Sequence, residues 1–384
     1  MSKKMRFYED KISQKIKTGE IVCGDHTKCH RSVNGTVFAL CDGIGSGIYA
    51  NISAISCSDR IVELFKLGVS LRSTVETVAA SMQRARTEDH PFSAFSAVAI
   101  LPDGQFSIYT YEAPQAIIIK NGTSSVLKPE FFTTGYEVVG ETVGVLDIGD
   151  SLVLCSDGVT QAGLGHGYGF GIGIENISDY INKLLQSGTD IHDLPEKITD
   201  MCARLMNGRY EDDTTLAVLH CQEANELTVM TGPPSKVSMD KEYVERFISM
   251  PGKKAICGST TADIVARETG RKVETLKMGT AFGIPPEYAI EGIDFTGEGA
   301  IILNQVYNIL DEPVENFTAN SAAERLCMMM LEADVIHMMI GNAMNDAHEV
   351  LLFKQVGVRV RRTAIKLIAE KLREKGKLVI ETYY

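Results

Sequence analysis

Four aspartates in the first part of the chain each lie beside a glycine or a second aspartate, at one end of an apolar run. They are Asp25 after Gly24, Asp42 before Gly43, Asp157 before Gly158, and Asp212 at the start of the run Asp-Asp-Thr-Thr. Carboxylates gathered at the ends of strands repel one another, and cations between them relieve that repulsion. Sites made only of oxygen ligands suit hard ions such as Mg²⁺ or Mn²⁺.

Such a site predicts hydrolytic chemistry on a phosphate ester. Two divalent ions held close together would lower the pKa of a bridging water and supply hydroxide at neutral pH. The same ions would hold a phosphoryl oxygen and neutralise charge during an in-line displacement. The sequence shows no Ser-His-Asp or Cys-His arrangement, so a covalent enzyme intermediate is not required.

The apolar pattern predicts the elements that must position these aspartates. We expect strands, then two helices, then a meander of strands with Asp-Gly and Asn-Gly turns, then two more helices and a final strand. The predicted strands are 21–25, 33–42, 93–101, 105–112, 115–120, 123–127, 151–155 and 214–220, and the predicted helices are 49–67, 71–86, 175–187 and 193–207. This order favours antiparallel sheets flanked by helices.

The remainder of the chain predicts a second, smaller unit. Residues 225–240, with Thr231-Gly232-Pro233-Pro234-Ser235, are expected to form a linker between a first domain at 1–224 and a second at 241–384. In the second domain we expect strands at 253–257 and 378–383 and helices at 261–269, 298–310, 320–333 and 361–376. The predicted fold class is α+β, an α-β-β-α sandwich followed by an α/β domain.

Composition narrows the functional classes. Apolar residues make up 44% and charged residues 23% of the 384 residues, as in ordinary globular proteins. A net charge of −12 argues against broad nucleic-acid binding, and most of the acidic excess lies in residues 1–224. We find no signal peptide and no apolar run long enough to cross a membrane, and nine cysteines without a CxxC pair fit a reducing compartment. The expected location is cytoplasmic, with no membrane partner.

The four motifs together resemble the metal-dependent protein phosphatases of type 2C, the PPM family, over about residues 15–221. The turn Asp42-Gly43-Ile44-Gly45-Ser46-Gly47 and the segment Ser156-Asp157-Gly158-Val159-Thr160 are similar to the bacterial SpoIIE branch in particular. This resemblance implies hydrolysis of phosphoserine or phosphothreonine in a regulatory protein, such as an anti-sigma-factor antagonist. It also implies two or more Mg²⁺ or Mn²⁺ ions, and activation by dimerisation, as a homodimer, or by partner proteins.

The resemblance also implies roles for individual residues. Asp42 would bridge both metals, the carbonyl of Gly43 would bind one, and Asp157 and Asp212 would hold the other, while Asp25 would bind directly or through water. In the Asp212-Asp213 pair, the first residue aligns with the family's ligand. The second is expected on the opposite face, because side chains alternate along a strand.

The chain departs from many eukaryotic members at two positions. Ile44 stands where they carry a histidine after the bridging Asp-Gly, and no clear equivalent of their phosphate-binding arginine is present. His26 and Arg31, which follow Asp25, are the candidates for substrate contact, with a solvated loop as the alternative. The glycine-rich run 163–173 is interpreted as a mobile flap beside the metal site or as a plain flexible loop.

The second domain matches no family that we recognise. The run Gly258-Ser259-Thr260-Thr261, between a predicted strand and a predicted helix, is a candidate ligand loop that could bind an anion, or else a capping turn. The leading hypothesis is a metal-dependent serine/threonine phosphatase gated by this domain. The alternatives are a pseudophosphatase that acts as a scaffold or sensor, and a protein whose main chemistry lies in the second domain.

Overall fold

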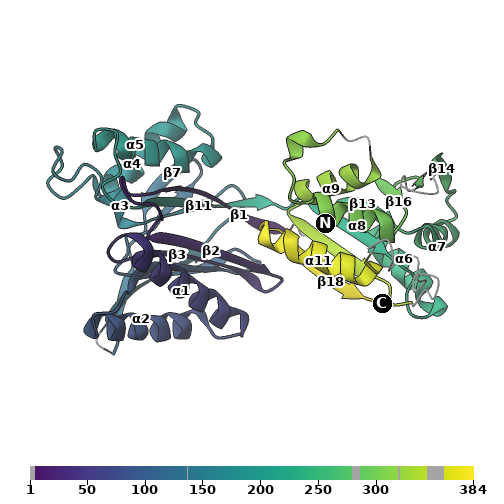
Figure 1. The fold of residues 1–384 in the computed structure, drawn as a ribbon, viewed down its shortest axis with the longest axis horizontal. Helices are drawn as coiled ribbons and strands as arrows, with labels where there is room; N and C mark the ends of the chain where they lie inside the picture. The colour runs from purple at the N-terminus through teal and green to yellow at the C-terminus, as the bar shows by residue number, and fades with distance from the viewer. Residues whose placement is uncertain (1–4, 136, 279–285, 319–320, 344–358) are drawn as a thin grey trace. The chain divides into compact units, whose positions relative to one another are not determined.

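The computed structural model describes residues 5–135, 137–278, 286–318, 321–343 and 359–384. The chain divides into two compact units, Met1–Glu223 and Ala224–Tyr384, and each is described by itself (Figure 1). Among the described residues, no helix combines the length and apolar character needed to cross a bilayer.

The first unit contains two antiparallel sheets. One has six strands in the order β2-β3-β4-β5-β9-β8, and the other has five in the order β1-β11-β10-β6-β7. The strands of the six-stranded sheet are β2 (Asp25–Ser32), β3 (Gly35–Gly43), β4 (Ser93–Ile100), β5 (Gln105–Tyr111), β8 (Glu130–Thr134) and β9 (Glu137–Val145). Those of the five-stranded sheet are β1 (Arg6–Lys15), β6 (Ile117–Lys120), β7 (Thr123–Val126), β10 (Ser151–Cys155) and β11 (Thr214–Glu223).

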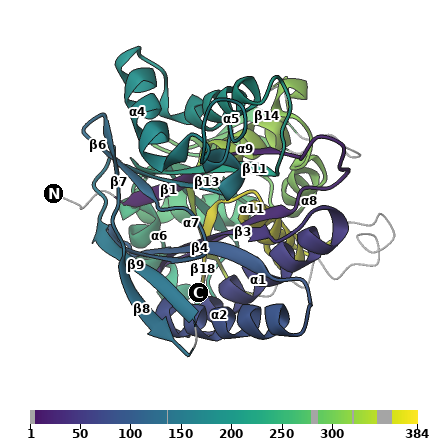
Figure 2. The same ribbon diagram turned by 90° about the vertical axis from the view of Figure 1, so that its left-hand side faces the viewer.

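Helices cover the outer face of each sheet (Figure 2). They are α1 (Gly47–Lys66), α2 (Leu71–Thr87), the short α3 (Asp157–Thr160), α4 (Gly173–Gln186) and α5 (Leu194–Leu205). The α1 and α2 helices pack on the six-stranded sheet, and α4 and α5 pack on the five-stranded sheet. A third apolar cluster fills the space between the sheets, with Leu40 and Val98 from one and Leu154 and Leu219 from the other. The predicted α-β-β-α sandwich is therefore confirmed.

The second unit is built on a seven-stranded sheet in the order β14-β15-β16-β13-β12-β17-β18. Its strands are β12 (Glu226–Thr231), β13 (Lys253–Cys257), β14 (Glu274–Lys277), β15 (Glu287–Ala289), β16 (Phe295–Gly297), β17 (Val335–Ile340) and β18 (Leu378–Tyr383). Pairing is parallel from β16 through β13, β12 and β17 to β18, while β14 and β15 add antiparallel edge strands.

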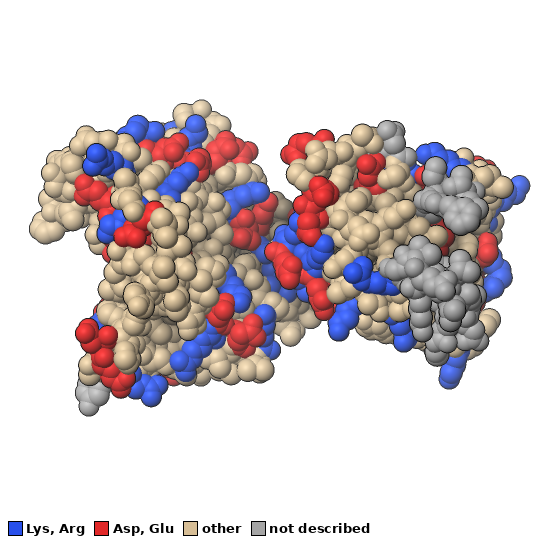
Figure 3. Space-filling model, viewed as in Figure 1, with Lys and Arg blue, Asp and Glu red and all other residues tan. Residues whose placement is uncertain are grey.

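Helices also lie on both faces of this sheet. They are α6 (Asp240–Ser249), α7 (Ser259–Thr269), α8 (Ala300–Ile309), α9 (Ala322–Glu332) and α11 (Arg361–Glu374). One apolar cluster joins α8, α9 and α11 to the sheet, and another joins α6 and α7 to its opposite face. The expected α/β architecture of the second unit is confirmed. On the face drawn in Figure 3, acidic and basic side chains are interspersed in both units.

Two sequence expectations differ from the structure. Residues 21–24 are not a strand, because Ile21 is 81% exposed and the ladder with β3 begins only at Asp25. The predicted linker 225–240 contains β12, which pairs with β13 and β17 inside the parallel sheet, and residue 240 already begins α6. The turn signal of Gly232-Pro233-Pro234 is real, but it ends a buried strand and does not mark a linker.

Candidate active site

Asp25 and Asp42 are brought together by the pairing of β2 with β3. They are direct partners in the antiparallel ladder, at the end of the pair nearest α1. Strand β3 is fixed in place because its residues from Gly35 to Cys41 are all buried. Gly43 follows Asp42, and a Cβ there would lie 2.0 Å from the carbonyl oxygen of Ala50 in α1. A glycine is thus required where the end of β3 meets the helix.

Asp157 and Asp212 come from the other sheet. Asp157 is the first residue of α3, two residues after the end of β10, and Asp212 lies just before β11. The antiparallel register of these two strands, with Cys155 opposite Leu216, places the end of β10 beside the start of β11. A Cβ on Gly158 would lie 2.2 Å from the carbonyl oxygen of Asp213, so this motif glycine also marks a close backbone approach.

Burial and neighbouring carboxylates disfavour the ionisation of Asp25, Asp42 and Asp212. The pKa of Asp42 is raised to about 10 by burial, by the charges of Asp25, Asp157 and Asp212, and by a side-chain hydrogen bond with Asp157. Burial, with smaller contributions from Asp213 and Asp157, raises the pKa of Asp25 to about 7, and burial and Asp157 also raise that of Asp212. The structure therefore gathers the four predicted residues into one centre where negative charge is destabilised.

Asp25 supplies the clearest test of whether a cation fits here. Its carboxylate is buried, and neither of its oxygens has a hydrogen-bond partner. The hydroxyls of Thr215 and Ser156 lie near enough to lower its pKa without completing a hydrogen bond in this geometry. A buried carboxylate without donors is costly, and a divalent ion would satisfy both oxygens. The donor set of carboxylates and a backbone carbonyl therefore fits Mg²⁺ or Mn²⁺.

The carboxylates do not form a closed cage. Within the described ranges, no three His, Cys, Asp or Glu side chains are gathered tightly enough to hold an ion by themselves. Mg²⁺ usually keeps several waters and takes only one or two carboxylates from a protein, so an open arrangement remains compatible with that ion.

Asp213 has a different environment from its neighbour Asp212. Its side chain is buried and accepts hydrogen bonds from the backbone N–H groups of Lys17, at 2.9 Å, and Gly24, at 2.8 Å. Asp212 is partly exposed, with the Lys17 ammonium 3.9 Å from its carboxylate. Strand β11 begins only after this pair, so strand alternation does not set their directions. Asp213 joins two segments of the chain, which leaves Asp212 as the carboxylate available to an ion.

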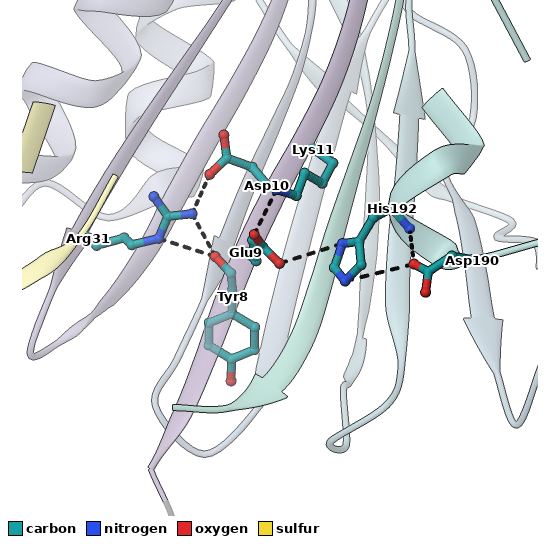
Figure 4. A network of polar contacts seen from close by, with 7 residues as sticks. All are labelled: Tyr8, Glu9, Asp10, Lys11, Arg31, Asp190 and His192. Carbon is teal, nitrogen blue, oxygen red and sulfur yellow. Dashed lines mark hydrogen bonds and ion pairs between the residues drawn. The ribbon is translucent and has the colours of Figure 1, made fainter. Parts of the chain in front are cut away.

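The two candidate substrate contacts do not lie at this centre. His26 places its Nδ1 2.7 Å from the Ser58 hydroxyl of α1, on the face of β2 opposite to Asp25. Arg31 is six residues along β2 from Asp25, roughly 20 Å away at the usual rise of a strand. Figure 4 shows its guanidinium bound to the carbonyl of Tyr8 and the carboxylate of Asp10 in β1. The structure contradicts a substrate role for Arg31, which joins the two sheets.

A cavity of 170 Å³ opens beside Asp212. It is lined by Gly158, Gln161, Ala162, Leu164, Cys202, Met206, Tyr210, Glu211, Asp212 and Thr214. The glycine-rich run 163–173 contributes Leu164 to this lining, and its His166 contacts the segment before Asp212 through Glu211 and Asn207, each at 3.1 Å. The proposed flap therefore lies next to the site.

Sequence reasoning did not predict the contacts that three residues make near the centre. Lys17 contacts Asp212, Gln161 donates to Asp157 at 2.7 Å, and Asp213 fixes the backbone beneath them. Only Asp213 had a visible signal, as the second member of a motif pair. The cysteines beside the candidate ligands are free thiols, and burial raises the pKa of Cys41 and Cys155, which disfavours the reactive thiolate.

In the second unit, the candidate ligand loop proves to be the start of a helix. Gly258 is the N-cap residue, with φ of +131°, and Ser259 to Thr261 form the first turn of α7. Thr261 is buried and accepts a hydrogen bond from the backbone N–H of Gly232.

Comparison with known proteins identifies the first unit. Residues 32–222 match the family model for stage II sporulation protein E (SpoIIE). These residues form a SpoIIE-family domain. The match confirms the family that the aspartate motifs predicted, the SpoIIE branch of the PP2C-type phosphatases. No curated protein matches the sequence.

Several solved structures are similar to the chain. One contains the PP2C phosphatase domain and a fragment of the regulatory domain of SpoIIE from Bacillus subtilis, with 19% identity and a TM-score of 0.47 over 58% of this chain and 65% of that one. The chain thus spans somewhat under two thirds of that structure's length.

Two further solved structures are similar to this chain. One contains RsbU and RsbW domains from Mycobacterium tuberculosis, with 13% identity and a TM-score of 0.49 over 64% and 67% of the two chains. The other is RsbX in complex with magnesium, with 17% identity and a TM-score of 0.42 over 58% and 98%. Because these TM-scores lie below 0.5, the assignment of the SpoIIE-family domain rests on the family model.

Proposed function

We propose that the SpoIIE-family domain is a divalent-metal-dependent phosphatase acting on phosphoserine or phosphothreonine. The observation that carries this proposal is the buried carboxylate of Asp25, without a donor on either oxygen, beside Asp42 with its strongly raised pKa. When bound, Mg²⁺ or Mn²⁺ ions would activate water and neutralise charge on the phosphoryl group. Asp25, Asp42, Asp157, Asp212 and the carbonyl of Gly43 are the proposed ligands.

The chain's own residues would hold and orient this centre. Asp213 fixes the backbone at Gly24 and Lys17, so Asp25 and Asp212 are held on neighbouring, tied segments. The N–H of Ile44 donates to the carbonyl of Phe92 at 2.9 Å, which fixes the peptide group that carries the Gly43 carbonyl. Gln161 donates to Asp157 and restricts its rotamer. Fixed ligands reduce the reorganisation that the reaction requires.

The proposed substrate is a phosphorylated regulatory protein, of the anti-sigma-factor antagonist kind. The cavity beside Asp212 could receive a side chain that neighbours the phosphorylated residue, since it includes the apolar Leu164 and Met206.

A direct test uses the full chain with Mn²⁺ and a phosphothreonine peptide. Asp42→Asn and Asp157→Asn should lower kcat roughly 100-fold or more, since each removes charge at the centre of the reaction. The matched control is Asp59→Asn, a half-exposed aspartate of α1 that pairs with Lys28 and lies outside the site. Calorimetric titration with Mn²⁺ gives a readout independent of turnover, and both site variants should bind Mn²⁺ more weakly than the control.

Two results would contradict the proposal. Equal Mn²⁺ affinity in the wild type and in Asp42→Asn would exclude the carboxylate centre as the ion site. Normal Mn²⁺ binding without turnover on any phosphopeptide would favour the pseudophosphatase alternative. We also propose that the second unit controls the phosphatase rate, and a rate that does not respond to any ligand of that unit would contradict this control.

A further inference from the structure

The parallel strands of the second unit follow a doubly wound order. From β12 the chain passes to β13 and β16 on one side and then returns to β17 and β18 on the other, so the order reverses between β12 and β17. In sheets of this kind, ligands bind outside the carboxyl ends of the strands at the reversal point. The register aligns Thr231 with both Cys257 and Ile340, so the ends of β13, β12 and β17 are level there.

Arg361, the first residue of α11, places its guanidinium at this reversal point. Its Nη2 donates to the carbonyl oxygen of Gly341, the residue after β17, at 2.9 Å. A Cβ built on Gly232, the residue after β12, would lie 2.0 Å from its Nη1. The guanidinium therefore lies between the ends of the two strands, in space that a side chain at position 232 would fill.

Among the described residues, the charge of Arg361 is not balanced by a carboxylate. No ion pair of Arg361 occurs in the described ranges, and its Nε is buried without a hydrogen-bond partner there. Burial, and then the charge of Arg362, lowers its pKa. Both arginines lie in the first turn of α11, where the helix dipole disfavours positive charge and no acidic residue compensates it. An anion is the group that would satisfy all of these features.

A second set of donors adjoins the same glycine. The N–H of Gly232 donates to the hydroxyl of Thr261 at 2.9 Å, which holds the first turn of α7 against the end of β12. No side chain caps α7, and its first turn carries no acidic residue. By contrast, Glu298 accepts hydrogen bonds from the first N–H groups of α8 and closes that helix end. The N–H groups of α7 are thus available beside Arg361.

We propose that the second unit binds the phosphate group of a small phosphorylated ligand between the ends of β12 and β17, with Arg361 and the first turn of α7 as its donors. A tetrahedral phosphate can accept from a guanidinium fork and from helix N–H groups at the same time. A single carboxylate would use both of its oxygens on the guanidinium and would leave none for the helix N–H groups. This site goes beyond the phosphatase function and does not depend on it.

The test is calorimetric titration of the full chain with pyrophosphate and, separately, with ADP. EDTA is present throughout, so that no divalent ion holds phosphate at the SpoIIE-family domain. We expect saturable binding of at least one probe, and a loss of affinity of about tenfold or more in Arg361→Met, as expected for a charge-assisted contact. The matched control is Arg373→Met on the same helix, whose guanidinium pairs with Glu381 and lies outside the crevice.

A readout without ligand separates binding from a structural role. If Arg361 serves a ligand, Arg361→Met should melt at or above the temperature of the wild type, because it removes a partly buried charge that has no carboxylate partner among the described residues. If that variant does not fold, Arg361→Lys keeps the charge and must still weaken probe binding, since it lacks the fork. Absence of binding of both probes to the wild type, or equal affinity in the wild type and the Arg361 variant, would overturn the proposal.

Discussion

Replacing Asp25 with asparagine should stabilise the metal-free protein although it removes a proposed metal ligand. The pKa of Asp25 in the fold is raised from 3.8 to about 7. A shift of about three pKa units corresponds to about 4 kcal/mol of destabilisation when the carboxylate is charged. Asparagine has nearly the same shape and no charge, so it removes this cost. Part of this stabilisation comes from Asp42, because the charge of Asp25 also raises the pKa of Asp42 and its removal makes the ionisation of Asp42 less costly.

The sign of this effect depends on pH. Below pH 3.8 the Asp25 carboxyl is protonated in both the folded and the unfolded states, so its ionisation does not affect stability. Between pH 3.8 and about 7 the unfolded state loses its proton first, so the metal-free protein becomes less stable as pH rises. Above about pH 7 the full cost is present. The advantage of Asp25→Asn should therefore be small near pH 4 and approach about 4 kcal/mol at pH 8.

Urea denaturation in EDTA at both pH values measures this difference. Hydrogen exchange in peptides from β4 and β10 reports the unfolding of the first unit separately. Asp59→Asn serves as the control and should show no pH-dependent gain, and added Mn²⁺ should reverse the order by stabilising only proteins that retain Asp25. If Asp25→Asn were less stable than the wild type at pH 8 in EDTA, the carboxylate would have a favourable partner in the metal-free fold, and the reasoning would be refuted.

Four further substitutions separate roles within the site. Asp212→Asn should weaken Mn²⁺ binding at least about tenfold by calorimetry, with little change in melting temperature. Asp213→Ala should instead lower the free energy of unfolding by about 3 kcal/mol, because two buried backbone N–H groups lose a charged acceptor. If Asp213→Ala weakened Mn²⁺ binding and Asp212→Asn lowered stability, the two residues would have exchanged roles. Gly43→Ala should cost about 1–3 kcal/mol in urea denaturation, since its Cβ would meet the carbonyl of Ala50, and unchanged stability would contradict that contact. His166→Ala should change KM more than kcat for a phosphopeptide, because it frees the glycine-rich run, and identical kinetics would exclude a flap role.

The sequence predicted the centre better than some of the elements around it. The aspartates could be located because the glycines beside Asp42 and Asp157 are required by close backbone contacts, which leaves a local signature. Strand β2 was misplaced because its polar residues alternate between α1 and the space between the sheets, while the apolar Ile21 before it is exposed. Strand β1 was missed because it has no long apolar run and is defined by its pairing with β11.

Long-range contacts account for the remaining differences. The buried role of Asp213 could not be predicted without knowing that the backbone N–H of Gly24 donates to it. Strand β12 resembled a linker because only its parallel pairing with β13 and β17 reveals it as a strand of the sheet. Arg361 has no local signature at all, since its significance comes from the ends of two strands that are distant in the sequence.

The origin of the four carboxylates from both sheets has a kinetic consequence. Asp25 and Asp42 belong to the first strands of the chain and Asp212 precedes one of the last strands of the same unit, so the ion site is complete only when pairing distant in sequence has formed. Such contacts form late, after most of the entropy of loop closure has been lost. Divalent ions should therefore retard unfolding of the first unit while leaving its refolding rate nearly unchanged.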